Sequence, residues 1–409
     1  MPSCNVRILR VFSYLWGMRR LLLLAALAAA ACGPRAPKEE SMEQLRDRVF
    51  MLAQVQTVYM DSLLPEGRCP RTFQGDTLVT SDIGWWTSGF YPGVLWMVYE
   101  QTGDETIRDL AVKHTLPLAG LLKRETDHDI GFQLMSSFGK MVKDRPSDGH
   151  FECSREIPPE SILARGAETL AARFIPEAGV IRSWNGNRWN IPVIIDNMMN
   201  LELLMVYGDR NVAEKHALTT VKNHFREDGT TFHLVDYADD GTILGQQTVQ
   251  GYADDSAWAR GQAWALYGYA MMALKEKELG NDALAKTFYD VAHKLESWLY
   301  GHLPEDGIPY WDFSQNDLRD ASAGAIIACG LLKLRQFRGA VDDGQALSTA
   351  ERILRTLASP EYLAEPRTNG GFLLKHGVGN IPGRSEVDVP LTYADYYFLE
   401  ALSLFPSDL

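Results

Sequence analysis

Two aspartates occur in strings whose residue types suit acid–base chemistry. Asp196 lies in IIDNMMNL (194–201), where most of its sequence neighbours are apolar. Burial among apolar side chains raises the pKa of a carboxyl group and keeps the acid protonated near neutral pH, as a proton donor requires. The competing interpretation is a helix-start cap after Pro192.

Asp129 lies in DHDIGF (127–132), where it and Asp127 flank His128. This pattern offers a second carboxylate close to an imidazole. It is also typical of an aspartate that caps a helix beginning near Phe132. Both interpretations stay open for this string by itself.

The string QGYADDSAWARGQAW (250–264) puts a cation near a helix start. Asp254, Asp255 and Ser256 are expected to cap the helix. Arg260 then falls in its first turns, where a positive charge opposes the helix dipole. A carboxylate ligand at that helix end would explain the placement. The alternative is an ion pair between Arg260 and Asp254 or Asp255.

Tryptophans accompany each of these groups. Trp184 in RSWN precedes the first aspartate, Trp258 and Trp264 flank the arginine, and Trp86 belongs to WWTSGFYPG (85–93). Flat indole faces stack on sugar rings, so these residues are suited to a sugar site. Each of them is also explained by packing in a helical core.

The elements that must position these groups have helical periodicity from residue 42 onward. Three predicted helices end in the similar turns Gly103-Asp104, Gly208-Asp209 and Gly280-Asn281. In each turn, glycine supplies a left-handed residue and Asp or Asn caps the next helix. The unit is a helical hairpin, and about six fit in the remaining length. An all-α fold, an (α/α)6 barrel of six helical hairpins, is predicted. An open solenoid fits less well because its repeats are shorter and more uniform.

Two stretches, 230–255 and 369–389, break the helical pattern and predict short β-hairpin-like loops. Long loops on a rigid scaffold commonly carry functional sites.

The N-terminal string RRLLLLAALAAAAC (19–32) predicts a secretory signal that is too short to span a bilayer. Its last residues resemble a bacterial lipobox, with Cys32 as the lipidated residue. We therefore expect a signal peptide over 1–31, with Met18 as an alternative start, a tether over 32–41 and a catalytic barrel over 42–409. The protein is expected to be exported to the periplasm or cell envelope and to touch the membrane only through its lipid. A non-lipidated signal cut near Cys32 is the alternative.

Composition excludes other classes of partner. The formal net charge of −13 lacks the basic footprint of nucleic-acid binding. The chain has no C-x-x-C or H-E-x-x-H motif, and its few scattered cysteines form no disulfide framework. We expect no metal and no cofactor.

Taken together and in order, these strings resemble the unsaturated glucuronyl hydrolases, glycoside hydrolase family 88. The matching strings are W-T-x-G-F-x-P-G, D-H-D-I-G-F, R-S-W-N, I-I-D-N-M-M-N, D-G-T-T-F-H, Q-G-Y-x-D-D-S-x-W-x-R-G-Q-A-W and D-V-P-L-x-Y-A-D-Y-Y-F-L-E-A-L. The similarity extends from about residue 45 to residue 405. Members of this family are (α/α)6 barrels that remove a Δ4,5-unsaturated uronic acid from the non-reducing end of lyase-generated oligosaccharides.

The resemblance implies roles for individual residues and a partner. Asp196 matches the family's general acid/base, and Asp129 matches its second essential carboxylate. The implied substrate-binding residues are Trp86, His128, Trp184, His233, Thr248, Gln250, Trp258, Arg260 and Trp264. The implied partner is an unsaturated oligosaccharide, typically a disaccharide.

Other functions remain open from the sequence. The related unsaturated rhamnogalacturonyl hydrolases share the barrel and the chemistry, although the strings around Asp129 and Asp196 favour the glucuronyl group. A glycan-binding lipoprotein without activity is a second alternative, and an epimerase on the same barrel is a more remote one. The parent polysaccharide is not determined.

Overall fold

The computed structural model describes residues 40–123, 125–144, 158–186, 188–341 and 344–406. The chain divides into two units, Met1–Ser41 and Met42–Leu409. The predicted signal peptide, Cys32 and most of the tether lie outside the described residues, so those expectations stay predictions. No helix in the described ranges combines the length and the apolar character needed to cross a membrane.

In the second unit, helices alternate between an outer and an inner position. The outer helices are α2 (Met42–Leu63), α4 (Glu105–Thr115), α7 (Pro159–Ala171), α9 (Arg210–His224), α11 (Asp282–His302) and α13 (Gln345–Leu357). The inner ones are α3 (Phe90–Thr102), α5 (Ile130–Leu134) continued by the π-helix η2 (Met135–Gly139) and α6 (Lys140–Asp144), η3 (Ile195–Asn200) with α8 (Leu201–Tyr207), α10 (Ala259–Glu278), α12 (Ala321–Arg338) and α14 (Thr392–Leu404). Short 3-10 turns are η1 (Leu116–Lys123), η4 (Gly339–Val341) and η5 (Asn369–Gly371).

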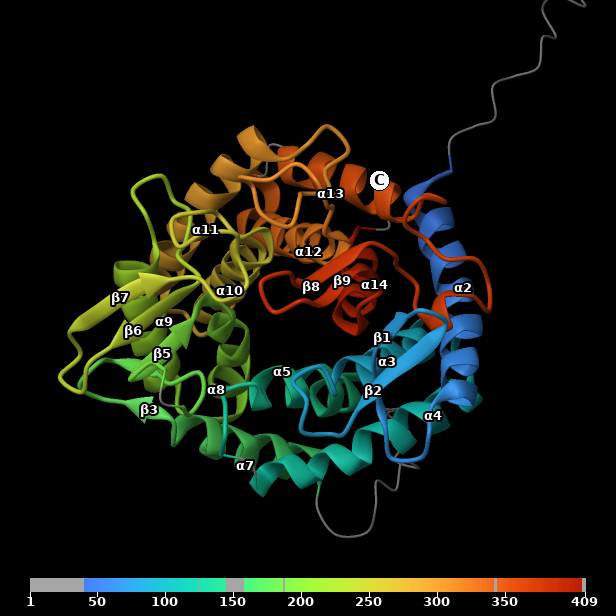
Figure 1. The fold of residues 1–409 in the computed structure, drawn as a ribbon, viewed down its shortest axis with the longest axis horizontal. Helices are drawn as coiled ribbons and strands as arrows, with labels where there is room; N and C mark the ends of the chain where they lie inside the picture. Colours follow the sequence, from blue (N-terminus) through green and yellow to red (C-terminus); the bar gives the residue numbers. More distant parts are fainter. Residues whose placement is uncertain (1–39, 124, 145–157, 187, 342–343, 407–409) are drawn as a thin grey trace, which may run out of the picture. The chain divides into compact units, whose positions relative to one another are not determined.

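The inner helices form a closed ring. Helix α3 packs on η2 and α6, α5 packs on η3, and η3 packs on α10. Helices α10, α12 and α14 follow in turn, and α14 packs back on α3. Figure 1 shows this ring in projection, with the remaining helices outside it. Closure confirms the predicted (α/α)6 barrel and rules out an open solenoid.

Burial explains which helices face inward. The inner helix α10 carries apolar or small residues on every side and is buried almost throughout. A helix that is apolar all round must lie inside other elements. The outer helix α13 buries only Ala346, Thr349, Ala350, Ile353, Leu354 and Leu357, whose spacing is one helix face.

The connections at the two ends of the ring differ in length. Tight turns lead from inner to outer helices between α3 and α4, between α8 and α9, and between α10 and α11. The long connections lead from outer to inner helices and contain all the strands of the described residues. These are β1 (Cys69–Gln74), β2 (Thr77–Ser81), β3 (Phe174–Ile175), β4 (Val180–Ile181), β5 (Ile191–Ile194), β6 (Leu234–Tyr237), β7 (Ile243–Gln247), β8 (Gly377–Asn380) and β9 (Ser385–Val389).

Both predicted loop hairpins are confirmed. The antiparallel pair β6–β7 lies within 230–255, and β8–β9 lies within 369–389. Strand β5 joins the first pair as a third strand, and the hairpin β1–β2 was not anticipated. Figure 1 shows β8 and β9 in front of the interior of the ring.

Two of the three predicted glycine turns have the expected conformation. Gly103 and Gly280 have φ values of 67° and 75°, which is the left-handed region that favours glycine. The prediction for Gly208 was wrong, because its φ is −139°. Glycine serves close packing there, since a Cβ would lie 2.7 Å from the Cβ of Ala167 on α7.

Candidate active site

A cavity of about 310 Å³ lies where the long connections enter the inner helices. It is lined by Gly84, Trp85, Trp86, Asp127, His128, Asp129, Phe132, Ser183, Trp184, Ile194, Asp196, Gln250 and Arg260. The four strings singled out in the sequence therefore meet at one site. Their residues come from connections that are far apart in the chain, and the ring brings them together.

Asp196 is the second residue of η3, directly after strand β5. Strand β5 pairs with β6, and the Ile195 N–H donates to the carbonyl of His233 at 2.9 Å. The residue is 9% exposed, and burial raises the pKa of its carboxyl to about 7. The positive charge of Arg260 and the indole of Trp264 oppose this rise. Asp196 can therefore hold a proton near neutral pH, as its sequence neighbours predicted.

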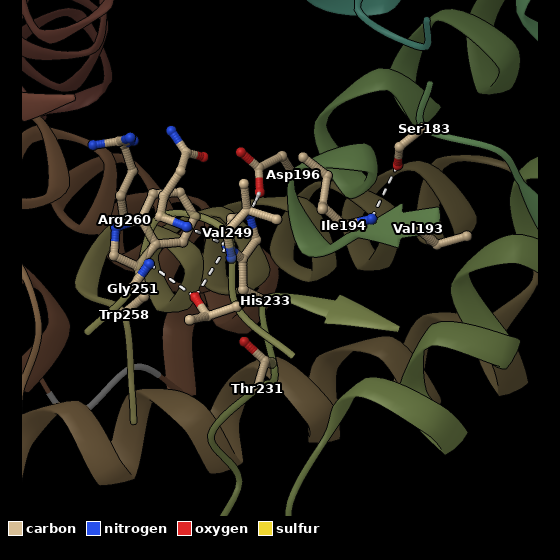
Figure 2. Close-up of polar contacts among 12 residues, drawn as sticks. Ser183, Val193, Ile194, Asp196, Thr231, His233, Val249, Gly251, Trp258 and Arg260 are labelled. Carbon is tan, nitrogen blue, oxygen red and sulfur yellow. Dashed lines mark hydrogen bonds and ion pairs between the residues drawn. The ribbon is translucent and has the colours of Figure 1, made fainter. Parts of the chain in front are cut away.

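His233 lies against this carboxyl. Its Nε2 is 3.7 Å from Asp196 Oδ1, and its ring packs on the indole of Trp258 with centroids 4.4 Å apart. Burial lowers the pKa of the imidazole to about 3, and the charge of Arg260 adds to this effect. The histidine is therefore neutral at the pH values at which Asp196 titrates. Figure 2 shows it between Asp196 and the loop that carries Val249 and Gly251.

Asp129 stands at the N-cap position of α5, but its side chain makes no capping hydrogen bond. Its carboxylate, 21% exposed, lines the cavity, and one oxygen is 3.4 Å from Nε2 of His128. Burial lowers the pKa of His128 to about 4, so this imidazole is also neutral. The side chain of Asp129 therefore does not cap the helix, although the residue stands at the N-cap position. The residue instead lines the cavity, where a ligand can meet its carboxylate beside His128.

Arg260 is almost completely buried and is held by groups distant in sequence. Its guanidinium contacts Asp320 at 3.3 Å and donates to the carbonyls of Val378 and Gly379, the latter at 2.6 Å. The alternative interpretation, an ion pair with Asp254 or Asp255, is not found among these contacts. Asp254 instead accepts from the backbone N–H of Thr248 at 2.8 Å. Arg260 still lines the cavity.

The predicted cap of the following helix was also wrong. Helix α10 begins at Ala259, with Trp258 at the N-cap position and no side-chain cap. Ser256 bonds instead to Asp312 at 2.6 Å. These polar residues therefore hold the loop in front of the helix and not its first turn.

The predicted aromatic residues divide into two groups. Trp86 and Trp184 line the cavity and can present a ring face to a sugar. Trp258 and Trp264 are 2% and 0% exposed and are not among the lining residues. Trp258 packs beneath Arg260, whose guanidinium carbon is 4.5 Å from its ring centre. These two indoles are buried behind the residues that line the cavity.

Gln250 lies on the cavity wall and its side chain donates to the Gly379 carbonyl at 3.2 Å. Thr248 does not line the wall. It lies behind His233, with 3.4 Å between Thr248 Oγ1 and Nδ1 of the imidazole.

Several residues at the site were not identified from the sequence. Asp320 anchors Arg260, and Tyr393 packs on Trp86 with ring centroids 4.8 Å apart. Tyr393 belongs to the last string that matches the family, so the sequence could have indicated that it lies near the site. Asp320 lies in no matching string. The described residues contain no group of three or more His, Cys, Asp or Glu side chains able to hold a metal.

The N-terminal ends of three long inner helices meet around Arg260. Arg260 is the second residue of α10, Asp320 is the N-cap of α12, and Tyr393 is the second residue of α14. Helix N-termini carry partial positive charge. Of these residues Arg260 lines the cavity, and its guanidinium, although paired with the Asp320 carboxylate, is the cationic group there that can meet an anion, while Asp129 and Asp196 lie on other connections.

Comparisons with known proteins agree on one group of enzymes. No family model matches the chain. The sequence is 39% identical over 334 residues to the unsaturated glucuronyl hydrolase of Formosa agariphila, covering 78% of this chain and 79% of that protein. Among solved structures, an unsaturated glucuronyl hydrolase specific for heparin has a TM-score of 0.80 at 39% identity, covering 89% of this chain and 97% of the other. A mutant enzyme from Streptococcus agalactiae complexed with dGlcA-GalNAc6S has a TM-score of 0.73 at 25% identity, covering 90% and 93%.

Proposed function

The chain belongs to the unsaturated glucuronyl hydrolases, and from this premise we propose that it removes a Δ4,5-unsaturated uronic acid from the non-reducing end of lyase-generated oligosaccharides. The observation that carries the proposal is the buried Asp196, with its pKa raised to about 7, in a cavity that is also lined by Asp127 and Asp129, the Arg260 guanidinium and three tryptophans. A related enzyme has been solved with an unsaturated disaccharide bound.

The reaction begins with the double bond. The substrate ring is an enol ether, because C4 is double-bonded to C5 and C5 carries the ring oxygen. Asp196 donates its proton to C4, which forms a C4–H bond and leaves positive charge at C5 that the ring oxygen shares. Asp196, now a carboxylate, takes a proton from water as that water adds to C5. The aspartic acid is thereby regenerated.

The product of hydration is unstable and completes the cleavage. The hemiketal at C5 opens to a ketone as the bond from C5 to the ring oxygen breaks. C1 then carries a hydroxyl group and the aglycone, and it collapses to an aldehyde as the aglycone leaves with a proton. The anomeric carbon is never attacked. The rule that relates carboxylate separation to retention or inversion therefore does not apply to this pair.

The remaining residues bind the sugar and stabilise charge. Asp129, beside neutral His128, accepts hydrogen bonds from sugar hydroxyls and stabilises the developing positive charge. Trp86 and Trp184 stack on the unsaturated ring. Arg260 and the surrounding helix N-termini attract the uronate carboxylate. The guanidinium has five N–H donors, so three protein acceptors leave donors for the ligand.

A panel of unsaturated disaccharides made by polysaccharide lyases tests this function. Each is incubated with the protein, and the ultraviolet absorbance of the conjugated double bond is followed. Loss of absorbance with uronate-terminated disaccharides from glycosaminoglycans supports the proposal. Turnover of pectin-derived rhamnogalacturonan fragments alone would favour the rhamnogalacturonyl alternative. Binding of these sugars without loss of absorbance would favour a glycan-binding protein.

We further propose that the enzyme is exported and anchored by a lipid on Cys32. The support is the sequence alone: two arginines, a short apolar run and a small-residue string before the cysteine. The test is fractionation of cells that express the whole chain, with mass spectrometry of the mature N-terminus. A soluble C32S variant and a lipid mass on the wild-type N-terminus are expected. Recovery of uncleaved chain would contradict the proposal.

A further inference from the structure

The imidazole of His233 meets hydrogen-bond donors at Nδ1. The backbone N–H groups of Val249 and Gln250 point to this atom at 3.1 and 3.2 Å. A backbone N–H can only donate, so Nδ1 must accept. The ring nitrogen on this side therefore carries no proton, and the contacts assign the tautomer.

Thr248 adds a third contact on the same side. Its hydroxyl oxygen lies 3.4 Å from Nδ1 and accepts from the Gly251 N–H at 2.8 Å. Because Nδ1 is an acceptor, the hydroxyl can only donate at this contact, and it shares the nitrogen's single lone pair with the two backbone N–H groups. The Thr248 N–H is itself held by Asp254. Figure 2 shows this loop meeting the imidazole on the side away from Asp196.

A neutral imidazole carries one proton, which must then sit on Nε2. This atom is buried and has no hydrogen-bond partner within 3.5 Å in the described part of the chain. Asp196 Oδ1 lies 3.7 Å from it and is likewise without a hydrogen-bond partner. The N–H therefore faces the carboxyl group across a gap that a small adjustment would close.

We propose that the loop Thr248–Gly251 is a positioning device that fixes His233 as its Nε2–H tautomer, so that the imidazole is a permanent donor toward Asp196 and never a base. To become a cation, the ring would need a proton on Nδ1, where two backbone N–H groups already point. The donor stabilises Asp196 in the carboxylate form that it reaches after protonating C4. Thr248 thus acts through His233, not on the sugar. The inference uses the proposed function only for the role of Asp196.

Other charged and titratable groups surround this pair and must be considered in any pH experiment. They are Arg260 on α10, His224 on α9, and Asp127, His128 and Asp129 across the cavity. Arg260 and His224 both disfavour a second proton on His233, so they act in the same direction as the loop. Arg260 is present in every variant used in the two tests of this proposal.

The first test reads the tautomer directly in the wild-type protein. The enzyme is labelled with ¹⁵N-histidine, and the signals of His233 are assigned by their absence in His233→Gln. We expect an unprotonated Nδ1 and a protonated Nε2, unchanged between pH 5 and pH 9. A proton on Nδ1, or titration within this range, would overturn the proposal. This readout needs no substrate, so it fails or succeeds independently of the proposed function.

The second test is kinetic. Thr248→Val should lower kcat about threefold to tenfold with KM nearly unchanged, because a less firmly held His233 donates less well to the Asp196 carboxylate that forms in the transition state. The alkaline limb of the kcat profile should move to higher pH, by up to about one unit, since ionised Asp196 becomes less stable. Thr248→Ser should restore both quantities.

Thr349→Val, a buried threonine on the outer helix α13, controls for the substitution itself. The positioning role is wrong if Thr248→Val folds but keeps the wild-type kcat and the wild-type alkaline limb of the pH profile. It is also wrong if this variant raises only KM. If this variant does not fold, the wild-type spectrum and Thr248→Ser decide the question. An Nδ1 proton in either protein would then reject the proposal.

Discussion

The side-chain oxygen of Asn200 accepts a hydrogen bond from the backbone N–H of Phe132 at 2.8 Å. This bond joins α5, which follows Asp129, to the end of η3, which carries Asp196. Gly131 permits the approach, because a Cβ at this position would lie 2.5 Å from the Asn200 Cα. The relative position of the two carboxylates therefore depends on a backbone contact between two inner elements.

Gly131→Ala should damage both stability and activity. The added methyl group must push η3 away from α5, and overpacking of this kind costs about 1–3 kcal/mol. We expect a lower free energy of unfolding in a denaturant titration and a kcat reduced by at least about tenfold. Gly301→Ala is the matched control, because nothing lies within 4 Å of a Cβ there and the residue is inside α11. Equal effects of the two substitutions would contradict the packing argument.

Asp196→Asn should remove the proton donor while leaving the fold. General acid–base catalysis contributes about 10²- to 10⁴-fold, and a loss of kcat in this range or beyond is expected. The measurement is the decay of ultraviolet absorbance of an unsaturated disaccharide. Asp236→Asn keeps an oxygen that can accept from Ile191 and serves as the buried control. Near-wild-type turnover by the Asp196 variant would refute the assignment.

The rate should fall on the alkaline side of neutrality. Asp196 must be protonated to donate a proton to C4, and burial raises the pKa of its carboxyl to about 7. The kcat profile should therefore lose activity as pH rises through about 7, with a mildly acidic to neutral optimum. An optimum that is purely alkaline would mean that another group supplies the proton.

The same carboxyl should make the wild-type fold less stable as pH rises. Its pKa is raised in the folded state from 3.8 to about 7, so the folded protein binds more protons than the unfolded chain between these values. Stability from this group is complete below about pH 4 and is lost as pH rises through 7. Asp196→Asn abolishes that loss, and at pH 8 the variant should be more stable than wild type by up to about 4 kcal/mol.

Thermal melts of both proteins at pH 4.5, 6 and 8 check this prediction. Asp395, another buried carboxyl with its pKa raised to about 7, is present in both proteins, so its contribution cancels in the difference. A stability difference that stays constant across the three pH values would show that Asp196 is not the titrating group.

Arg260→Lys should weaken substrate binding and loosen the hairpin over the site. A lysine keeps the charge but cannot reach Asp320 and two carbonyls together. We expect KM to rise about tenfold or more, with faster hydrogen exchange in residues 369–389. The control is Arg355→Lys, whose pair with Glu351 lies on the outer helix α13. Unchanged exchange in this segment would mean that Arg260 does not hold the hairpin.

Sequence alone was sufficient for the features that depend on local pattern. The apolar period and the turns at Gly103 and Gly280 predicted helical hairpins, and their number predicted the ring. The apolar neighbours of Asp196 predicted a raised pKa, because residues next to a carboxyl in the chain tend to share its burial. The hairpins within 230–255 and 369–389 followed from turn-forming residues. Each of these features is set by residues that are close in sequence.

The tertiary structure decided the partners and the exposure of the remaining groups. The string around Arg260 offered two nearby aspartates, yet the guanidinium bonds to Asp320 and to carbonyls more than 100 residues away. Trp258 and Trp264 had the same sequence signal as Trp184, but only Trp184 reaches the cavity. Thr248 matched a substrate contact and lies behind His233. Burial and long-range hydrogen bonds arise only when distant segments pack, so no local string contains them.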